Sequence, residues 1–167
     1  MRNKHVTMMT QAAIIAALYV VLTMVANAMG LASYAIQIRF SEALCILPYF
    51  TFAAVPGLPI GCLIANLLTG AGIWDILFGT LATFLGALGS RLLKKNRFLV
   101  TLPPVIANAL IVPMILRYGY GITWMYEGVD YSIPYFMATV GIGEIISVCI
   151  LGSMLLKALL PYKRTIF

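Results

Sequence analysis

Five carboxylates in an otherwise apolar chain are the residues best suited to chemistry. They are Glu42, Asp75, Glu127, Asp130 and Glu144. A charged side chain well inside a bilayer costs about 2.5–3.5 kcal/mol, so it usually faces a partner or a water-filled cavity. Glu144 lies inside an apolar segment and has no cation within one helical turn. We therefore expect Glu144 to contact a solute, with an ion pair to a distant segment as the alternative.

Glu42 and Asp75 each have a structural explanation beside a functional one. Glu42 follows Arg39 by three residues and could pair with it on one helix face. Asp75 stands at the start of an expected helix, where a carboxylate stabilises the positive end of the helix dipole. Both remain candidates for solute binding, with these alternatives open.

Amide and aromatic side chains supplement the carboxylates. Asn66 and Asn108 lie in apolar segments, where an amide can donate and accept in fixed geometry. Hydrogen bonds between helices are the alternative. Aromatic residues cluster near the predicted outer face, namely Trp74, Tyr118, Tyr120, Trp124, Tyr126 and Tyr131. Most are expected to form an interfacial belt, and one or two to stack on a ligand.

The chain lacks the motifs of an ATPase or a metalloenzyme. Its cysteines, Cys45, Cys62 and Cys149, lie in apolar runs and should behave as small hydrophobic residues. The single histidine, His5, is in the basic leader, and no His and carboxylate spacing suits a metal. A GxxxxGK phosphate loop is missing too. We expect no catalytic residue, metal or cofactor; a membrane enzyme using two or three carboxylates is a third option without a supporting motif.

The composition requires an apolar solvent around the chain. Of 167 residues, 62% are apolar and 10% are charged. These are too few polar residues to cover the surface of a soluble globular protein. At roughly 20 residues per crossing, about six spans would use most of the chain. The prediction is an all-α integral membrane protein, a single domain of residues 1–167, with six transmembrane helices at about 6–29, 41–54, 58–70, 74–93, 98–116 and 133–160. Pro56, Gly57 and Pro59 separate the second helix from the third.

Basic residues predict the orientation, because Lys and Arg are retained on the cytoplasmic side. With both termini cytoplasmic, the inner residues are Arg2, Lys4, Arg91, Lys94, Lys95, Arg97, Lys157, Lys163 and Arg164. Only Arg39 and Arg117 then lie outside. A re-entrant hairpin of the second and third helices would not change this result. The N-terminal segment, with Ala26-Asn27-Ala28, loosely resembles a cleavable signal peptide, but its apolar run is long for one.

Two surfaces follow from these predictions. The outer ends of the second, fourth, fifth and sixth helices bring carboxylates, amides, an arginine and aromatics together, which indicates an outward-opening pocket for a small, planar, cationic or donor-rich solute. Small residues give the first helix a smooth face for close packing, within the bundle or with another protein; they are Ala12, Ala13, Ala16 and Ala17. A small ion-coupled secondary transporter or channel, with Glu144 as proton relay, is the alternative function.

Five blocks of the sequence resemble the QueT family. They are IQIRFSEALCILPYF (36–50), GLPIGCLIANLLTG (57–70), WDILFGTLATFLGALGSRL (74–92), NALIVPMIL (108–116) and GIGEIISVCILG (141–152). They cover more than half of the chain in order, and RFSEAL and WDILFGT are the more specific. The resemblance implies a substrate-binding S component of an energy-coupling factor (ECF) importer, a six-helix protein of the prokaryotic plasma membrane.

The resemblance also implies partners and a substrate class. S components dock through an Ala-x-x-x-Ala face of the first helix onto an ECF module of one transmembrane coupling protein and two ATPases, and Ala12 and Ala16 match that motif. The expected substrates are queuosine precursors such as 7-aminomethyl-7-deazaguanine, or queuine.

A deazaguanine would assign roles to the candidate residues. Glu144 would bind the guanine edge, and Glu42 or Asp75 would lie near the aminomethyl cation. The remaining predicted contacts are to the acceptor atoms of the ring, by Arg39, Asn66 and Asn108, and stacking, by Trp74.

Overall fold

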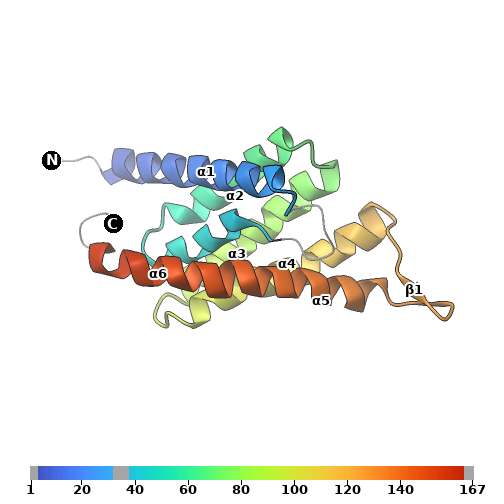
Figure 1. The fold of residues 1–167 in the computed structure, drawn as a ribbon. Coiled ribbons are helices and arrows are strands. Elements are labelled where there is room, and N and C mark those ends of the chain that lie inside the picture. The colour runs from blue at the N-terminus through green and yellow to red at the C-terminus, as the bar shows by residue number, and fades with distance from the viewer. Residues whose placement is uncertain (1–3, 32–37, 164–167) are drawn as a thin grey trace.

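The fold is a bundle of helices lying roughly along one axis, seen in a computed structural model that describes residues 4–31 and 38–163. Helix α1 begins and helix α6 ends at the same end of this bundle (Figure 1). The helices are α1 Lys4–Ala28, α2 Ala54–Leu68, α3 Thr80–Leu92, α4 Leu102–Met114, α5 Ser132–Glu144 and α6 Ser153–Leu159. Segments of tighter or wider helix join or extend them: η1 Phe40–Tyr49, η2 Asp75–Gly79, η3 Leu99–Thr101, η4 Ile115–Gly119, η5 Ile145–Gly152 and η6 Leu160–Tyr162.

Within the described residues, three helices are long and apolar enough to cross a membrane. They are Lys4–Ala28, Leu99–Gly119 and Ser132–Tyr162, and the last two are continuous rods built from several of the segments above. Two further apolar helices are shorter, Phe40–Tyr49 and Ala54–Leu68. The chain is therefore an α-helical, multi-pass membrane protein. The number of crossings, six in our prediction, and the side on which the termini lie stay predictions.

The segment expected to form a helix over 41–54 instead forms the 3-10 helix η1, from Phe40 to Tyr49. A 3-10 helix rises about 2.0 Å per residue, so these ten residues cover more length than an α-helix would. Such long 3-10 runs are uncommon in isolation because their hydrogen bonds are poorer. Every residue from Ser41 to Pro48 is buried, and η1 packs against α1, α3 and η5. Tertiary packing therefore stabilises this central element.

Helices α1 and α2 pack at very short range through small residues. A Cβ atom added to Gly57 would lie 2.8 Å from the carbonyl oxygen of Ala12, and one added to Gly61 would lie 2.9 Å from that of Ala16. In lipid, such close approach is a main source of helix association. Ala12 and Ala16 thus pack against α2 inside the bundle, whereas Ala13 and Ala17 are exposed on α1.

A short hairpin connects η4 to α5. Strands β1 (Met125–Tyr126) and β2 (Val129–Asp130) are antiparallel, with Met125 opposite Asp130 and Tyr126 opposite Val129. The two turn residues, Glu127 and Gly128, have φ of 49° and 81°. Positive φ at both central positions is the mark of a type I′ turn, which matches the twist of a two-residue hairpin.

Candidate solute-binding cavity

A largely polar cavity of about 220 Å³ lies among the ends of α1 and α2, the residue before η1, η2, the α4–η4 rod and α5. Its polar lining residues are Asn27, Arg39, Asn66, Thr69, Asp75, Asn108 and Glu144. The remainder of the lining is small or apolar: Ala71, Gly79, Val112, Leu116 and Val140. Segments far apart in the sequence therefore bring polar groups to one place in an otherwise apolar bundle.

Three segments with wide, π-type helical turns contain or adjoin residues that line this cavity. Asp75 begins η2, Leu116 lies in η4, and Glu144 immediately precedes η5. Such turns are rare and occur often at functional sites, because the extra residue redirects side chains and leaves backbone groups less tightly paired. The local helix geometry thus turns Asp75 and Glu144 towards a common space.

Glu144 and Asn108 are the most informative residues of the lining. Glu144 is 8% exposed and Asn108 5% exposed, and neither Glu144 Oε2 nor Asn108 Nδ2 has a hydrogen-bond partner among the described residues. A buried polar atom without a partner costs about 1–3 kcal/mol, and more when charged. Each of these two cavity-lining residues therefore carries one buried polar atom that is unpaired in this conformation.

Arg39 supplies the positive charge of the cavity. It precedes the first residue of η1 in an extended conformation, with φ −105° and ψ 109°. Its guanidinium interacts electrostatically with Glu42 and Glu144, yet within the described part of the chain it forms no ion pair within contact distance. The charges of Arg39 and Glu144 therefore attract across the cavity without closing it.

Asn66 and Asp75 form the wall contributed by α2 and η2. The Nδ2 atom of Asn66 donates a hydrogen bond to the backbone oxygen of Asp75, at 3.1 Å. The Asp75 Oδ2 atom accepts a hydrogen bond of 2.6 Å from the hydroxyl of Tyr120, which follows η4. Both side chains are held in place by these bonds.

Glu42 does not line the cavity. Glu42 belongs to η1, and its side chain is 2% exposed and faces α1. One carboxylate oxygen accepts a hydrogen bond from the Tyr19 hydroxyl, and the other accepts one from Cys45 Sγ at 3.0 Å. One turn along α1, the Thr23 hydroxyl donates to Ser41 Oγ at 2.9 Å. This polar layer ties α1 to η1, and a contact between Glu42 and a solute stays a prediction.

Trp74 lies in a different place from its neighbour Asp75. It is 43% exposed and stacks on Phe78, with ring centroids 5.9 Å apart and planes at 21°. With Leu110, Met114 and Gly119 it lines a separate apolar groove of about 430 Å³. In this conformation Trp74 does not line the polar cavity, and its stacking on a solute stays a prediction.

Sequence reasoning missed several lining residues. The sequence around Asn27 indicates only a possible signal-peptide ending, and that around Thr69 indicates no binding role, although both residues line the cavity. Asn27 could have been found from its position near the end of the first apolar helix, level with Arg39. Val112, Leu116 and Val140 are ordinary apolar residues of membrane helices and carry no signal of their own.

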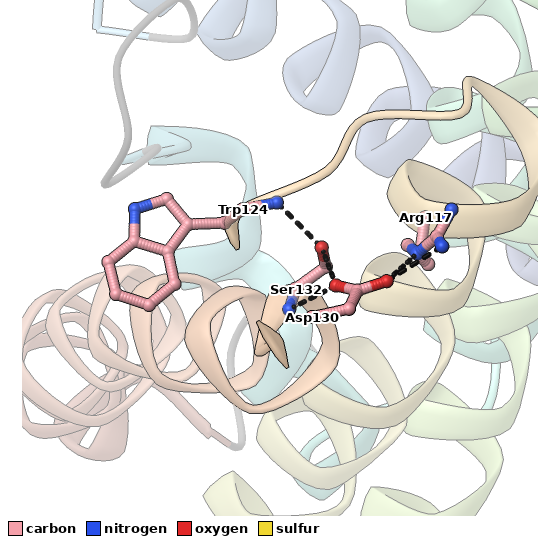
Figure 2. A network of polar contacts seen from close by, with 4 residues as sticks. All are labelled: Arg117, Trp124, Asp130 and Ser132. Carbon is pink, nitrogen blue, oxygen red and sulfur yellow. Dashed lines mark hydrogen bonds and ion pairs between the residues drawn. The ribbon is translucent and has the colours of Figure 1, made fainter. Parts of the chain in front are cut away.

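Figure 2 shows the polar network that anchors the hairpin to η4. The Nε and terminal nitrogen of Arg117 lie 2.8 and 2.7 Å from Asp130 Oδ2, and the other Asp130 oxygen accepts from the backbone and the hydroxyl of Ser132. The backbone nitrogen of Trp124 donates to Ser132 Oγ at 2.6 Å. The hydrogen bonds from Ser132, together with the Arg117 guanidinium, hold the pKa of Asp130 below its ordinary value.

Spanning apolar helices that enclose a polar cavity define a multi-pass membrane protein with a place for a small molecule. A family model described as QueT transporter matches residues 9–161. The chain therefore belongs to the QueT transporter family, which gives it a transport role. No curated protein and no solved structure matches the chain.

Proposed function

We propose that this chain is the substrate-capture subunit of an ATP-driven ECF importer, and that it binds a deazaguanine precursor of queuosine in the polar cavity. The observation that supports this proposal is that two residues lining that cavity, Glu144 and Asn108, each have a buried polar atom without a hydrogen-bond partner, Glu144 Oε2 and Asn108 Nδ2. A ligand that donates to the first and accepts from the second would satisfy both.

The edge of a guanine-like ring offers both N–H donors and a carbonyl acceptor, as such a ligand requires. Its adjacent N–H groups suit a carboxylate, which accepts two parallel hydrogen bonds in bidentate pairs. Its carbonyl oxygen suits the amide nitrogen of Asn108 or the guanidinium of Arg39. Glu144 would therefore bind the N–H groups of the ring edge, while Asn108 and Arg39 bind its acceptors.

The size of the cavity supports a small guest. Drug-sized ligands usually occupy pockets of roughly 300–1,000 Å³. A space of about 220 Å³ suits a single bicyclic base with a short substituent better than a nucleoside. Within the proposed class, an aminomethyl deazaguanine is therefore favoured over the larger queuine.

Transport requires a route from capture to release. In the proposed cycle the solute enters the cavity, and the loops after the expected first, third and fifth helices close over it, the first of these loops lying largely outside the described residues. The loaded chain then docks through the α1 face that retains Ala13 and Ala17 at its surface. ATP hydrolysis in the partner module reorients the chain and releases the solute inside.

The test is a binding panel on the purified chain in detergent. We expect 7-aminomethyl-7-deazaguanine to raise the melting temperature in a saturable way, because a ligand stabilises the state that binds it. Guanine should act more weakly, and thiamine and riboflavin should have no effect. Stabilisation by a B vitamin with none by any deazapurine would overturn the assignment.

A further inference from the structure

The carboxylate of Asp75 is held from outside the cavity by Tyr120. The Tyr120 hydroxyl donates to Asp75 Oδ2 at 2.6 Å, and the hydrogen bonds of the described residues leave the other oxygen, Oδ1, unused. Asp75 lines the cavity and Tyr120 does not. One oxygen is thus occupied by an anchoring donor while the second stays available to a guest.

The position of Tyr120 depends on a glycine. A Cβ atom added to Gly72 would lie 2.2 Å from the Tyr120 hydroxyl oxygen and 2.8 Å from two carbons of its ring. Beside it, a Cβ added to Gly119 would come within 3.0 Å of the Trp74 ring. The turn at Gly119 and Tyr120 therefore packs directly on the start of η2, with Trp74 on one side and Asp75 on the other.

Tyr120 is a donor at neutral pH. Partial burial, followed by the hydrogen bond and charge of Asp75, raises the pKa of its hydroxyl above the ordinary tyrosine value. The proton therefore stays on the phenol, and the bond to Asp75 persists across the physiological range. This behaviour suits a fixed anchor.

The charge of Asp75 has no cationic partner in the described part of the chain. The ion pair found there joins Arg117 to Asp130, and the guanidinium of Arg39 interacts with Glu42 and Glu144. Asp75 is paired only with a neutral hydroxyl. A cation from the guest would complement this charge, since a hydrogen bond to a carboxylate is stronger when the donor is also charged.

We propose that Asp75 is the residue that selects a cationic amine on the solute, and that Tyr120 is the positioning residue that holds Asp75 for this purpose. This inference rests on the proposed function and assigns the amine subsite of the same cavity. It gives Asp75, and not Glu42, the contact with the cation.

The experiment compares two ligands that differ in one group, the cationic aminomethyl group of 7-aminomethyl-7-deazaguanine and the neutral hydroxymethyl group of its 7-hydroxymethyl counterpart. Their dissociation constants are measured by calorimetry on the full chain and on four variants: Asp75→Asn, Tyr120→Phe, Gly72→Ala and Tyr118→Phe. Tyr118→Phe is the matched control, because Tyr118 is a nearby exposed tyrosine that does not line the polar cavity. The readout is the ratio of the two constants, which a general loss of folding would not change.

The wild-type chain should prefer the amine by about tenfold or more, as expected for a charge-assisted hydrogen bond. Asp75→Asn should bring the ratio close to unity. Tyr120→Phe and Gly72→Ala should each lower the ratio about three- to tenfold without additive effect when combined, because both remove one hydrogen bond. Tyr118→Phe should leave it unchanged.

Each contrary result has a separate meaning. Equal wild-type affinities for the two ligands would overturn the amine subsite while leaving deazaguanine binding intact. A wild-type preference that survives both Tyr120→Phe and Gly72→Ala would overturn the role of Tyr120. Absence of binding by both ligands would overturn this inference together with the proposed function.

Discussion

Single side chains decide what this cavity can bind. Glu144 and Asn108 are buried with an acceptor and a donor unused, in surroundings where an unpaired polar atom is costly. Thr80 Oγ1 and Ser147 Oγ are also buried without a hydrogen-bond partner. Thr80 follows the lining residue Gly79 directly, and Ser147 follows the lining residue Glu144 by three positions. Unpaired polar atoms therefore also occur next to residues that line the cavity.

The substitution Glu144→Gln should weaken binding of 7-aminomethyl-7-deazaguanine by about tenfold to a hundredfold. The new side chain has nearly the same shape but loses the charge and replaces one acceptor oxygen with a donor. Isothermal titration calorimetry on the purified chain measures the dissociation constant. Glu127→Gln is the control, because Glu127 is exposed in the hairpin turn and does not line the cavity. An unchanged constant for Glu144→Gln would remove Glu144 from the binding role.

At the scale of elements, α1 is fixed to the rest of the bundle by two different contacts. Gly57 and Gly61 admit the backbone of Ala12 and Ala16, and the Glu42 carboxylate receives the Tyr19 hydroxyl. The first contact is apolar and tight, and the second is a buried polar link to η1. Because Arg39 immediately precedes η1, the position of α1 and one wall of the cavity are mechanically connected.

The substitution Gly61→Ala should destabilise the chain by about 1–3 kcal/mol, the usual cost of overpacking. Its Cβ would lie 2.7 Å from the Tyr19 Cβ and 2.9 Å from the Ala16 oxygen, so α1 must move away from α2. Thermal unfolding in detergent, followed by circular dichroism, measures the loss. Gly141→Ala is the matched control in another helix, because its Cβ would meet only the Ala109 Cβ, at 4.0 Å. Equal melting temperatures for the two variants would contradict the close α1–α2 packing.

The hairpin should detach from η4 in acid. The pKa of Asp130 is lower in the folded chain than in the unfolded chain, so its contribution to stability is present above the unfolded pKa and is lost as the pH falls through the folded value. The loss should therefore occur below about pH 4, the ordinary aspartate pKa. Trp124 fluorescence in a Trp74→Phe background reports it, since the chain has two tryptophans.

The control for this titration is Asp130→Asn in the same background. An asparagine does not titrate, so its Trp124 signal should show no transition in this range. An identical acid transition with aspartate and asparagine would show that another group controls the hairpin.

At the scale of the whole molecule, capture and energy supply are separate tasks. The sequence contains no GxxxxGK phosphate loop, and a polar cavity of about 220 Å³ accounts for binding alone. Accumulation of the solute against its concentration gradient would need either a coupled ion gradient or an ATP-hydrolysing partner. The proposed function selects the partner.

Proteoliposomes distinguish these two sources of energy. The chain alone should bind 7-aminomethyl-7-deazaguanine without accumulating it, with or without a proton gradient. Addition of an ECF module and ATP should start uptake, and replacing ATP with a non-hydrolysable analogue should stop it. Uptake by the chain alone, driven by a proton gradient, would instead support the ion-coupled transporter.

The substitution Ala17→Leu should separate docking from binding. Ala17 is exposed on α1, so a larger side chain there should hinder a close-packed partner helix while the cavity stays unchanged. ATP-driven uptake should fall severalfold, and the dissociation constant of the solute should stay the same. Ala28→Leu, an exposed change near the end of the same helix, is the control. Normal uptake by Ala17→Leu would exclude this face as the docking surface.

The sequence by itself determined the membrane class, the helical architecture and most of the polar side chains that line the cavity. Apolar composition leaves few alternatives to a lipid-embedded bundle, and a polar side chain inside an apolar helix needs a partner or a cavity. This reasoning singles out Asn66, Asn108 and Glu144, whereas Asp75 is singled out at the start of an expected helix and Arg39 receives its contact from the family resemblance. All five residues line the cavity, and their roles in binding stay predictions.

Only the tertiary structure decided where Glu42, Trp74 and the small residues of α1 lie. Neighbouring helical residues point about 100° apart, so Asp75 can face the cavity while Trp74 faces an apolar groove. The Glu42 carboxylate accepts hydrogen bonds from Tyr19 of α1 and from Cys45 of its own helix, η1. Ala12 and Ala16 pack against glycines of α2. Such outcomes depend on which elements become neighbours in space, and local sequence does not encode that information residue by residue.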